Sequence, residues 1–395
     1  MSAPSIGIHD LSIATTHYVI DQATLARYHG VPIDKYHRGL GQEAMSVAAA
    51  DEDIVTLAAT AARPILDRHG TDSIRTVLLA TESSVDQAKA AGLYLHSLIG
   101  LPHTCRVVEL KQACYSATAA LQLATGLITH DPTEHVLIIA TDIARYDLDT
   151  PAEATQGAAA TAILVTADPA LAELHPVTGI YSTDINDFWR PNYRTTAIVD
   201  GKLSINAYLN AIHHAYTDYR HRGGRALDEF AAFCYHQPFT TMAYKAHRHL
   251  LQAHDFSPTT SDLDHALAAT THYNRMIGNS YTASVYLALA SLLDHGDDLT
   301  GKPIAMLSYG SGCVAEFFTV TPVGGYRTAL RTDTNRETIH ARKPIDYHRY
   351  RALLTEPPHT KGNHVLPRTT NAPYRLAAID DHTRVYETVR RAETA

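Results

Sequence analysis

Short runs of apolar residues recur along the chain and alternate with longer stretches rich in alanine and leucine. A run of about four to six consecutive apolar residues is typical of a strand that is covered on both faces. On this pattern we predict strands at residues 76–81, 106–110, 136–141, 161–166, 230–235, 304–309 and 314–320. Strands that alternate with helix-length stretches indicate an α/β fold.

Two of the helix-length stretches, residues 114–128 and 279–293, carry small residues on most faces. This composition is typical of helices that are buried against a sheet. Each stretch is followed by a strand, a glycine-containing bend and a second strand. The two stretches start 165 residues apart, and the strands after them, at 136 and 304, start 168 residues apart. The repeated order predicts an internal duplication.

We therefore expect two pseudo-symmetric halves, residues 1–170 and 171–395, with the starts of the two buried helices meeting at one site between them. From about residue 328 the chain is more polar and contains several prolines. We predict that this last segment forms peripheral helices and loops around the second half.

Composition narrows the class of protein. The chain has 395 residues, of which 45% are hydrophobic and 19% charged, and this balance excludes global disorder. A net charge of −8 argues against nucleic acid or an anionic membrane as the main partner. No apolar run approaches the roughly 18 residues of a membrane helix, and the start does not resemble a signal peptide. Four cysteines without CxxC spacing suggest neither a disulfide scaffold nor a zinc site, so we expect a cytoplasmic protein with free thiols.

Three residues at predicted strand ends could carry chemistry. Cys114 stands where a buried helix begins, and such a position favours the thiolate and offers backbone N–H groups to an oxyanion; it could equally be a small core residue. His236 follows the strand at 230–235, where catalytic groups often stand in α/β sheets. Glu82 follows the strand at 76–81 and could be a general base in a dry pocket, or a solvated helix cap.

Other patterns suggest sites that we do not favour. Residues 310–315 match G-x-G-x-x-A, a dinucleotide fingerprint, but the following residues have the pattern of a strand and not of a helix. Two histidine-containing sets have spacings that could ligate a metal. We expect both to lie on solvated helices instead: His214, Asp218 and His221, and His247, His249 and His254.

Taken together, several long motifs resemble the hydroxymethylglutaryl-CoA synthase family of the thiolase superfamily. The motifs that hold candidate residues are ATESS (Glu82), ELKQACYSAT (Cys114), FCYHQPF (His236), GNSYTASVYLALASLL (Asn279) and LSYGSG (Ser311). Further matches are KYHRGLGQEAM (35–45), IATDIARYDL (139–148), DFWRP (187–191) and VDGKLSINAYL (199–209). The resemblance covers the chain to about residue 325.

The resemblance implies a duplicated thiolase-like fold in five layers, αβαβα, and a defined chemistry. Acetyl-CoA would acylate Cys114, and Glu82 would take a proton from the acetyl methyl group. The resulting carbon nucleophile would attack the ketone of acetoacetyl-CoA, which His236 would polarise and protonate. Hydrolysis would release 3-hydroxy-3-methylglutaryl-CoA, an intermediate of the mevalonate route to isoprenoids.

The same resemblance assigns the surrounding residues. It places Thr155 in the acyl pocket, Ser204 and Lys245 on CoA, Asn279 on the acetoacetyl thioester, and Ser311 near an oxyanion donor. Asp187, Trp189 and Tyr309 would also lie at the substrate site. The family implies no metal or organic cofactor, since CoA thioesters are the substrates, and it implies a homodimer.

One departure from the family pattern keeps alternatives open. The family usually has a lysine five residues after the catalytic histidine, where this chain has Thr241. In the family this lysine would hold the phosphates of CoA. Its absence favours an alternative function, in which the substrate is a polyketide carried on an acyl carrier protein. A second alternative is a thiolase-fold protein that binds acyl-CoA without turnover. That alternative predicts the loss of Glu82, Cys114 or His236, and all three are present.

Overall fold

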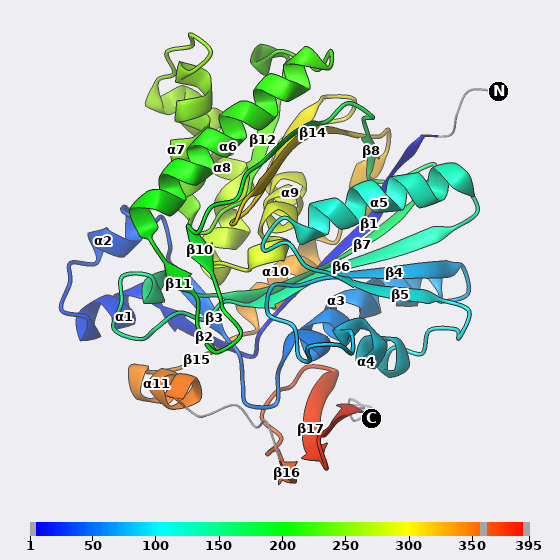
Figure 1. The fold of residues 1–395 in the computed structure, drawn as a ribbon, viewed down its shortest axis with the longest axis vertical. Helices are drawn as coiled ribbons and strands as arrows, with labels where there is room; N and C mark the ends of the chain where they lie inside the picture. The colour runs from blue at the N-terminus through cyan, green and yellow to red at the C-terminus, as the bar shows by residue number, and fades with distance from the viewer. Residues whose placement is uncertain (1–4, 356–361, 390–395) are drawn as a thin grey trace.

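A ten-stranded mixed sheet runs through the computed structural model, which describes residues 5–355 and 362–389 (Figure 1). All seven predicted strands belong to it. The strand order is β12 (Ala232–Tyr235), β13 (Ile304–Gly310), β14 (Val314–Pro322), β8 (Ala172–Leu174), β1 (Ile6–Thr15), β7 (Ala158–Ala167), β6 (His135–Ile143), β4 (Ile74–Ala80) and β5 (Arg106–Leu110), and β9 (Gly179–Ser182) pairs with β14. The sheet is continuous across both predicted halves because β8 pairs with both β1 and β14.

Helices cover both faces of each half of the sheet. The helices concerned are α3 (Ile54–His69), α4 (Ala91–Leu98), α5 (Ser116–His130), α6 (Gly201–His221), α7 (Thr240–Gln252), α8 (Thr260–Ile277) and α9 (Ser284–His295). In Figure 1, α3 and α4 lie below strands β4 to β7, and α6, α7 and α8 lie at the upper left.

Side chains that alternate along the strands define the layers. On β6, Val136 and Ile138 pack in the core that contains α5 and α9, while Leu137 packs in the core that contains α3 and α4. On β13, Met306 packs in the first of these cores, while Leu307 packs against α6 and α7. The two parts of the continuous sheet therefore form two separate layers, with α5 and α9 between them. The order of layers is helix, sheet, helix, sheet, helix, and the predicted five-layer αβαβα fold is confirmed.

The two helices of the central layer are buried to different extents. All residues of α9 from Ser284 to Leu293 are buried, as expected for a helix that is apolar on every face. On α5 only one face is buried, and Leu123 is 52% exposed on the other face. The hydroxyl groups of Thr118 on α5 and Tyr286 on α9 lie 3.0 Å apart and join the two helices.

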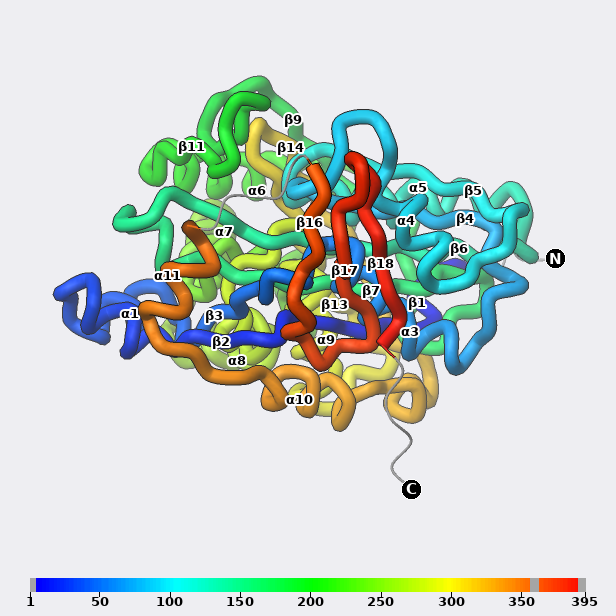
Figure 2. Tube along the Cα trace, turned by 90° about the horizontal axis from the view of Figure 1, so that it is seen from below, coloured from blue at the N-terminus to red at the C-terminus, as the bar shows by residue number. Residues whose placement is uncertain are grey.

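The segment after residue 328 differs from the prediction. It contains two helices, α10 (Thr332–His340) and α11 (Tyr347–Thr355), and then a separate sheet of β16 (His364–Val365), β17 (Tyr374–Asp380) and β18 (Thr383–Thr388). This sheet lies against α3 and α4 of the first half and not around the second (Figure 2). Tyr374 packs into the α3/α4 core, and Tyr386 donates a hydrogen bond to Asp53, which explains the docking. Residues 356–361 and 390–395 lie outside the described residues.

A smaller sheet of β2 (Tyr18–Asp21), β3 (Ala44–Val47) and β15 (Lys343–Pro344) lies beside two short helices, α1 (Gln22–Tyr28) and α2 (Asp34–His37). It was not predicted, because its strands are short and carry mixed polar and apolar residues.

Close backbone contacts hold the two halves together where the buried helices begin. A Cβ atom on Gly310, at the end of β13, would lie 2.6 Å from the carbonyl oxygen of Gln112, beside Cys114. A Cβ atom on Gly157, before β7, would lie 2.8 Å from the backbone nitrogen of Asn279. In each half, the backbone at one end of a strand lies against the turn that precedes the central helix of the other half. The contact is so close that only glycine fits there.

Candidate active site

A cavity of about 330 Å³ lies between the two halves. Eight of the residues selected from the sequence line it: Cys114, Thr155, Ser204, His236, Lys245, Asn279, Tyr309 and Ser311. The rest of its wall is largely aromatic and apolar, with Tyr146, Phe188, Tyr208, Phe239 and Tyr281 among its residues. A mostly apolar cavity with a few convergent polar groups is typical of a small-molecule site. We call it the acyl cavity.

Cys114 and Glu82 meet because the strands before them are parallel neighbours. Glu82 follows β4 and Cys114 follows β5, so both residues lie at the carboxyl edge of the sheet. The Sγ of Cys114 donates a hydrogen bond to the Oε2 of Glu82 over 3.4 Å. Ala113, just before the cysteine, has a φ of +45°, a conformation that favours glycine and that turns the chain sharply into α5.

Burial and neighbouring charges keep protons on both groups. Burial and, to a smaller extent, the nearby Asp142 carboxylate together raise the pKa of Glu82 to about 8, against the opposing effect of the hydrogen bond from Cys114. Burial raises the pKa of the Cys114 thiol well above its usual value, and the Glu82 carboxylate adds to the effect. The expectation of a resting thiolate at the helix N-terminus is therefore wrong, because desolvation outweighs the local backbone N–H group.

Asp142, at the end of β6, holds the Glu82 turn and was not singled out from the sequence. Its Oδ1 accepts hydrogen bonds from the Thr81 hydroxyl and from the backbone N–H groups of Glu82 and Ser83, at 2.8–2.9 Å. Its Oδ2 accepts the backbone N–H and the hydroxyl of Thr282, from the second half. The carboxyl is fully buried. Asp142 thus fixes the position of Glu82 and joins the two halves.

His236 reaches the acyl cavity from the end of β12. Its backbone carbonyl accepts a hydrogen bond from the Tyr208 hydroxyl over 2.8 Å, and its backbone N–H donates to Leu307. The ring Nδ1 is buried and has no hydrogen-bond partner among the described residues. Burial lowers the pKa of His236 to about 3, so the imidazole is neutral at physiological pH. A neutral imidazole can donate one N–H to a ligand oxygen.

Asn279 lies in a network with two tyrosines that the sequence analysis did not select. Its Nδ2 donates to the Tyr146 hydroxyl over 2.9 Å, and its Oδ1 accepts the backbone N–H of Tyr281 over 2.9 Å. The rings of Tyr146, Phe188 and Tyr281 contact one another edge to face. These residues belong to motifs of the resemblance, but an aromatic residue in one sequence gives no sign of which cavity it lines.

Asp187 and Trp189 do not line the acyl cavity. Asp187 is buried behind its wall, where its carboxylate accepts hydrogen bonds from Tyr309, Ser204 and the backbone N–H of Gly312 at 2.8–3.2 Å. This placement agrees with a supporting role. Trp189 lines a second, neighbouring cavity instead. It was expected at the substrate site, and it lies near the acyl cavity without lining it.

Comparison with known proteins gives the family. The N-terminal model of hydroxymethylglutaryl-coenzyme A synthase matches residues 3–170, and the C-terminal model matches residues 174–269 and 258–346. The chain belongs to the hydroxymethylglutaryl-CoA synthase family. It is an enzyme of that family, with the family's thiolase-like acyltransferase fold, and the predicted resemblance is confirmed.

Similar proteins include both CoA-type and carrier-type members of the family. Hydroxymethylglutaryl-CoA synthase of Enterococcus faecalis is 38% identical over 386 residues, which are 97% of this chain and 99% of that protein. A polyketide biosynthesis 3-hydroxy-3-methylglutaryl-ACP synthase of Bacillus subtilis is 33% identical over 82% of each chain. The crystal structure of an HMG-CoA synthase complexed with CoA matches with a TM-score of 0.92 and 40% identity, over 98% of this chain and 100% of that one.

Thr241, which stands where the family usually has a lysine, and Lys245 lie near the entrance of the acyl cavity. Lys245 is exposed there, with its ammonium 5.0 Å from the centre of the Phe239 ring. Thr241 donates its hydroxyl to the backbone carbonyl of Gly39 over 2.7 Å and so braces a loop instead of reaching outward. Lys245 is therefore the cation that the acyl cavity offers at its entrance.

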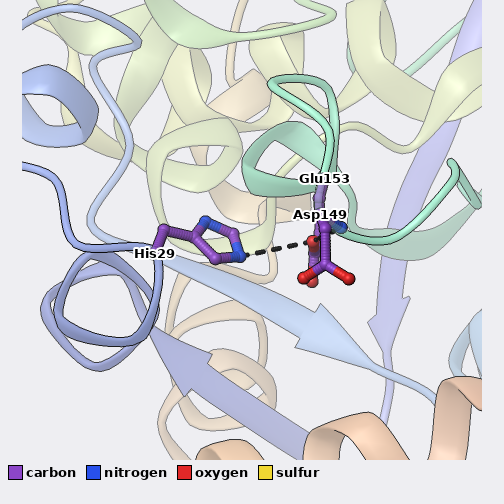
Figure 3. A group of neighbouring side chains, drawn as sticks. All are labelled: His29, Asp149 and Glu153. Atoms are coloured by element: carbon purple, nitrogen blue, oxygen red, sulfur yellow. Dashed lines mark hydrogen bonds and ion pairs between the residues drawn. The ribbon is translucent and has the colours of Figure 1, made fainter.

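Among the described residues, one group of three side chains, His29, Asp149 and Glu153, has potential metal-ligand atoms within 4.8 Å of one another (Figure 3). Its members already have protein partners. His29 pairs with Glu153 at 3.3 Å, Glu153 accepts from Tyr350, and Asp149 pairs with Arg351 at 2.7 Å. We assign the group to holding α1, α11 and the loop at 149–155, whose Pro151, Ala152 and Thr155 line the acyl cavity.

The patterns that we did not favour have clear outcomes. The G-x-G-x-x-A run continues into β14, so a dinucleotide fold is absent there, as predicted. His214 and His221 are exposed on α6, as predicted. The expectation that His247 is solvated is wrong: it is 2% exposed and lies 3.0 Å from the Tyr235 hydroxyl. None of the helices in the described ranges combines the length and apolar character that crossing a bilayer requires.

Proposed function

We propose that Cys114, Glu82 and His236 carry out the condensation of acetyl-CoA with acetoacetyl-CoA and water, which gives 3-hydroxy-3-methylglutaryl-CoA and CoA. The observation that carries the proposal is the thiol of Cys114 at the inner end of an apolar cavity, in contact with a carboxyl of raised pKa. The product places the chain in the mevalonate route to isoprenoid precursors.

The first step is acyl transfer to Cys114. As Sγ attacks the acetyl carbon, its proton passes to the Glu82 carboxylate 3.4 Å away. The C–S bond to CoA then breaks, and the departing CoA sulfur takes that proton. The backbone N–H of Cys114, at the start of α5, can stabilise the oxyanion of the tetrahedral intermediate. The step requires the ionised form of Glu82, which is the minor form at neutral pH because its pKa is raised to about 8. In that form the acceptor of the thiol proton is already in contact with Sγ.

The second step forms the carbon–carbon bond. Glu82, again ionised, removes a proton from the acetyl methyl group, a weak acid whose removal needs a desolvated base. The resulting carbanion attacks the ketone of acetoacetyl-CoA, and the N–H of His236 donates a hydrogen bond to the ketone oxygen as negative charge develops. The proton that Glu82 removed then neutralises the alkoxide, so the 3-hydroxyl forms and Glu82 is ionised again. Asn279 and Thr155 are proposed to hold the acyl groups, and Ser204 and Lys245 to hold the CoA chain near the entrance. Hydrolysis of the Cys114 thioester then frees the product.

Intact-protein mass spectrometry after incubation with acetyl-CoA tests the covalent step. The wild-type chain should gain one acetyl group, and Cys114→Ser should gain none, while Cys234→Ser, a change at another buried cysteine, should still be acetylated. An adduct that survives Cys114→Ser would disprove the proposed intermediate.

The pH dependence of acylation should show the titration of Glu82. Since its pKa is raised to about 8 in the free enzyme, kcat/KM for acetyl-CoA should rise about tenfold per pH unit up to about pH 8 and then level off. His236 should add no second limb near neutrality, because its pKa is lowered to about 3. Stopped-flow acylation from pH 5.5 to 9.5 measures the profile, and Glu82→Gln serves as the control that should lack this limb.

The form of the second substrate can be decided by kinetics. A CoA thioester is favoured because the CoA-type relative is 38% identical to this chain, against 33% for the carrier-type relative. We expect kcat/KM to be at least tenfold higher with acetoacetyl-CoA than with an acetoacetylated acyl carrier protein. A reversed preference would assign the chain to polyketide β-branching.

A homodimer is supported by the open edge of the large sheet. Within the described residues β5 pairs only with β4, and β5 carries the exposed Val108; the helices that contact β5 also carry exposed leucines, Leu93 on α4 and Leu123 on α5. An exposed apolar edge strand is a template for pairing with another chain. We propose that two copies pair through β5.

Sedimentation velocity tests this assembly. The wild-type chain should sediment as a dimer, and Val108→Lys should shift it to monomer because a charge is placed at the centre of the pairing edge. Val385→Lys, at an equally exposed valine on β18, is the matched control and should remain dimeric. A wild-type monomer would exclude the proposed pairing.

The four unpaired cysteines support a cytoplasmic location.

A further inference from the structure

A second cavity, of about 880 Å³, lies on the other side of Glu82 from the acyl cavity. Its inner wall includes Glu82, Ser83, Gln112 and Ala113, and its outer rim includes the exposed residues Lys111 and Asn186. It therefore leads from solvent to the proposed base. We call it the solvent vestibule.

The catalytic groups divide between the two cavities. Cys114 and His236 line the acyl cavity and not the vestibule, whereas Glu82 lines the vestibule and not the acyl cavity. Phe188 and Ser311 line both, so the wall between them is one residue thick at those points. Gln112 donates a hydrogen bond to the Ser311 carbonyl over 3.2 Å across this wall. The 3.4 Å contact from Cys114 to Glu82 thus connects the two spaces.

The two cavities also differ in chemistry. The acyl cavity is walled by aromatic and aliphatic side chains, which suit an acyl chain and exclude water. The vestibule is walled by groups that hydrogen-bond to water, among them Ser83, Glu109, Lys111, Gln112 and Arg190. Arg190, in its wall, donates hydrogen bonds to the backbone carbonyls of Glu82 and Ser83 and so fixes the turn that carries the proposed base.

Hydrolysis of the condensed intermediate requires a route for water that is separate from the acyl cavity. At that stage the acyl group bridges Cys114 and CoA, so the CoA chain occupies the acyl cavity to its entrance. The water oxygen must form a bond to the thioester carbon while the C–S bond to Cys114 breaks. The products are a carboxylate, the Cys114 thiol and one proton. One water must therefore enter, and one proton must leave, while the acyl cavity is full.

We propose that the solvent vestibule supplies the hydrolytic water to acyl-Cys114 and releases the proton through Glu82. This inference rests on the proposed function, since it concerns the last step of that reaction. The water approaches from the Glu82 side, and Glu82 takes one of its protons and passes it to the departing Cys114 sulfur. The second proton is lost when the new carboxylic acid ionises, and it reaches solvent through Glu82 and the vestibule. The acyl cavity carries the acyl chains only.

Filling the acyl cavity of acetylated wild-type enzyme tests the route directly. The probe is desulfo-CoA, which lacks the thiol and cannot accept the acetyl group; its inhibition of acylation sets a saturating concentration. We expect acetyl-Cys114 to hydrolyse at no less than half its free rate with desulfo-CoA bound. A decrease of tenfold or more would show that water enters through the acyl cavity and would overturn the proposal.

A change at the rim of the vestibule gives the converse test. Asn186→Trp should slow hydrolysis of acetyl-Cys114 at least fivefold relative to Asn186→Ala, while acylation by acetyl-CoA stays within twofold in both variants. Equal hydrolysis rates in the two variants would contradict the proposal. Failure of the wild-type enzyme to form any acetyl adduct would instead refute the proposed covalent chemistry, so the two failures are distinguishable.

Discussion

Replacing Glu82 by glutamine should lower the rate of 3-hydroxy-3-methylglutaryl-CoA formation about 10⁴-fold, while acetyl-Cys114 still forms. Glutamine keeps the shape of the side chain but cannot remove a proton from the methyl group. It also removes a negative charge that raises the pKa of Cys114, so the thiol ionises more easily and can still be acylated. Product formation and the acetyl adduct are measured on the same sample. Condensation at the normal rate would require another base.

The same substitution should raise thermal stability in a pH-dependent way. The pKa of Glu82 is about 8 in the folded chain and near its ordinary value of 4.5 in the unfolded chain, so the folded state binds more protons between these two pH values. Wild-type stability is therefore lost as pH rises across this window, by about 1.4 kcal/mol per pH unit at most. Glu82→Gln should melt close to the wild type at pH 4.5 and clearly above it at pH 8. No difference at pH 8 would mean that the carboxyl is not desolvated.

Replacing Asp142 by asparagine should destabilise the chain by about 3 kcal/mol and lower the condensation rate at least 100-fold. An amide nitrogen in place of one carboxylate oxygen faces donors from Glu82 and Ser83, or from Thr282, and cannot accept from them. The Glu82 turn then shifts relative to Cys114. Loss of the Asp142 charge should also lower the pKa of Glu82 and move the acylation limb to lower pH.

Urea unfolding, single-turnover kinetics and the acylation pH profile measure these three effects. Thr282→Ser is the matched control, because it keeps the hydroxyl that donates to Oδ2 and should resemble the wild type. A purely structural role for Asp142 would lower stability without moving the pH profile, so an unshifted limb would contradict the positioning role.

The large sheet shows where sequence patterns succeed and where they fail. The seven strands with continuous apolar runs were predicted, because burial on both faces selects apolar residues at every position. Strand β1 was missed, although it lies in the middle of the sheet, because its sequence includes His9 and Asp10. Asp10 is fully buried and pairs with Arg331 at 2.6 Å. The ion pair with Arg331, 321 residues away in the sequence, offsets the cost of burying the Asp10 charge in a core strand. No local sequence pattern shows such a distant partner.

The candidate site divides in a similar way. Glu82 and His236 stand within two residues of a strand end, Cys114 lies in the short connection between β5 and α5, and the motifs of the family identify all three. Asp142, Tyr146 and Arg190 lie within or beside the same motifs, but their contacts with Glu82 and Asn279 arise only when the strand ends and loops converge. A lone acidic or aromatic residue in one sequence does not show what it will contact.

By itself, the sequence predicted an α/β fold with an internal repeat, because burial leaves a record of apolar runs in the chain. The family resemblance of its motifs implied the five αβαβα layers and the roles of the thiol, the carboxyl and the imidazole. Only the tertiary structure decided that the resting thiol keeps its proton, that Glu82 titrates near pH 8, and that two separate cavities reach the Cys114–Glu82 contact. Desolvation and through-space charge depend on distances between groups that are remote in sequence, and those distances exist only in the folded chain.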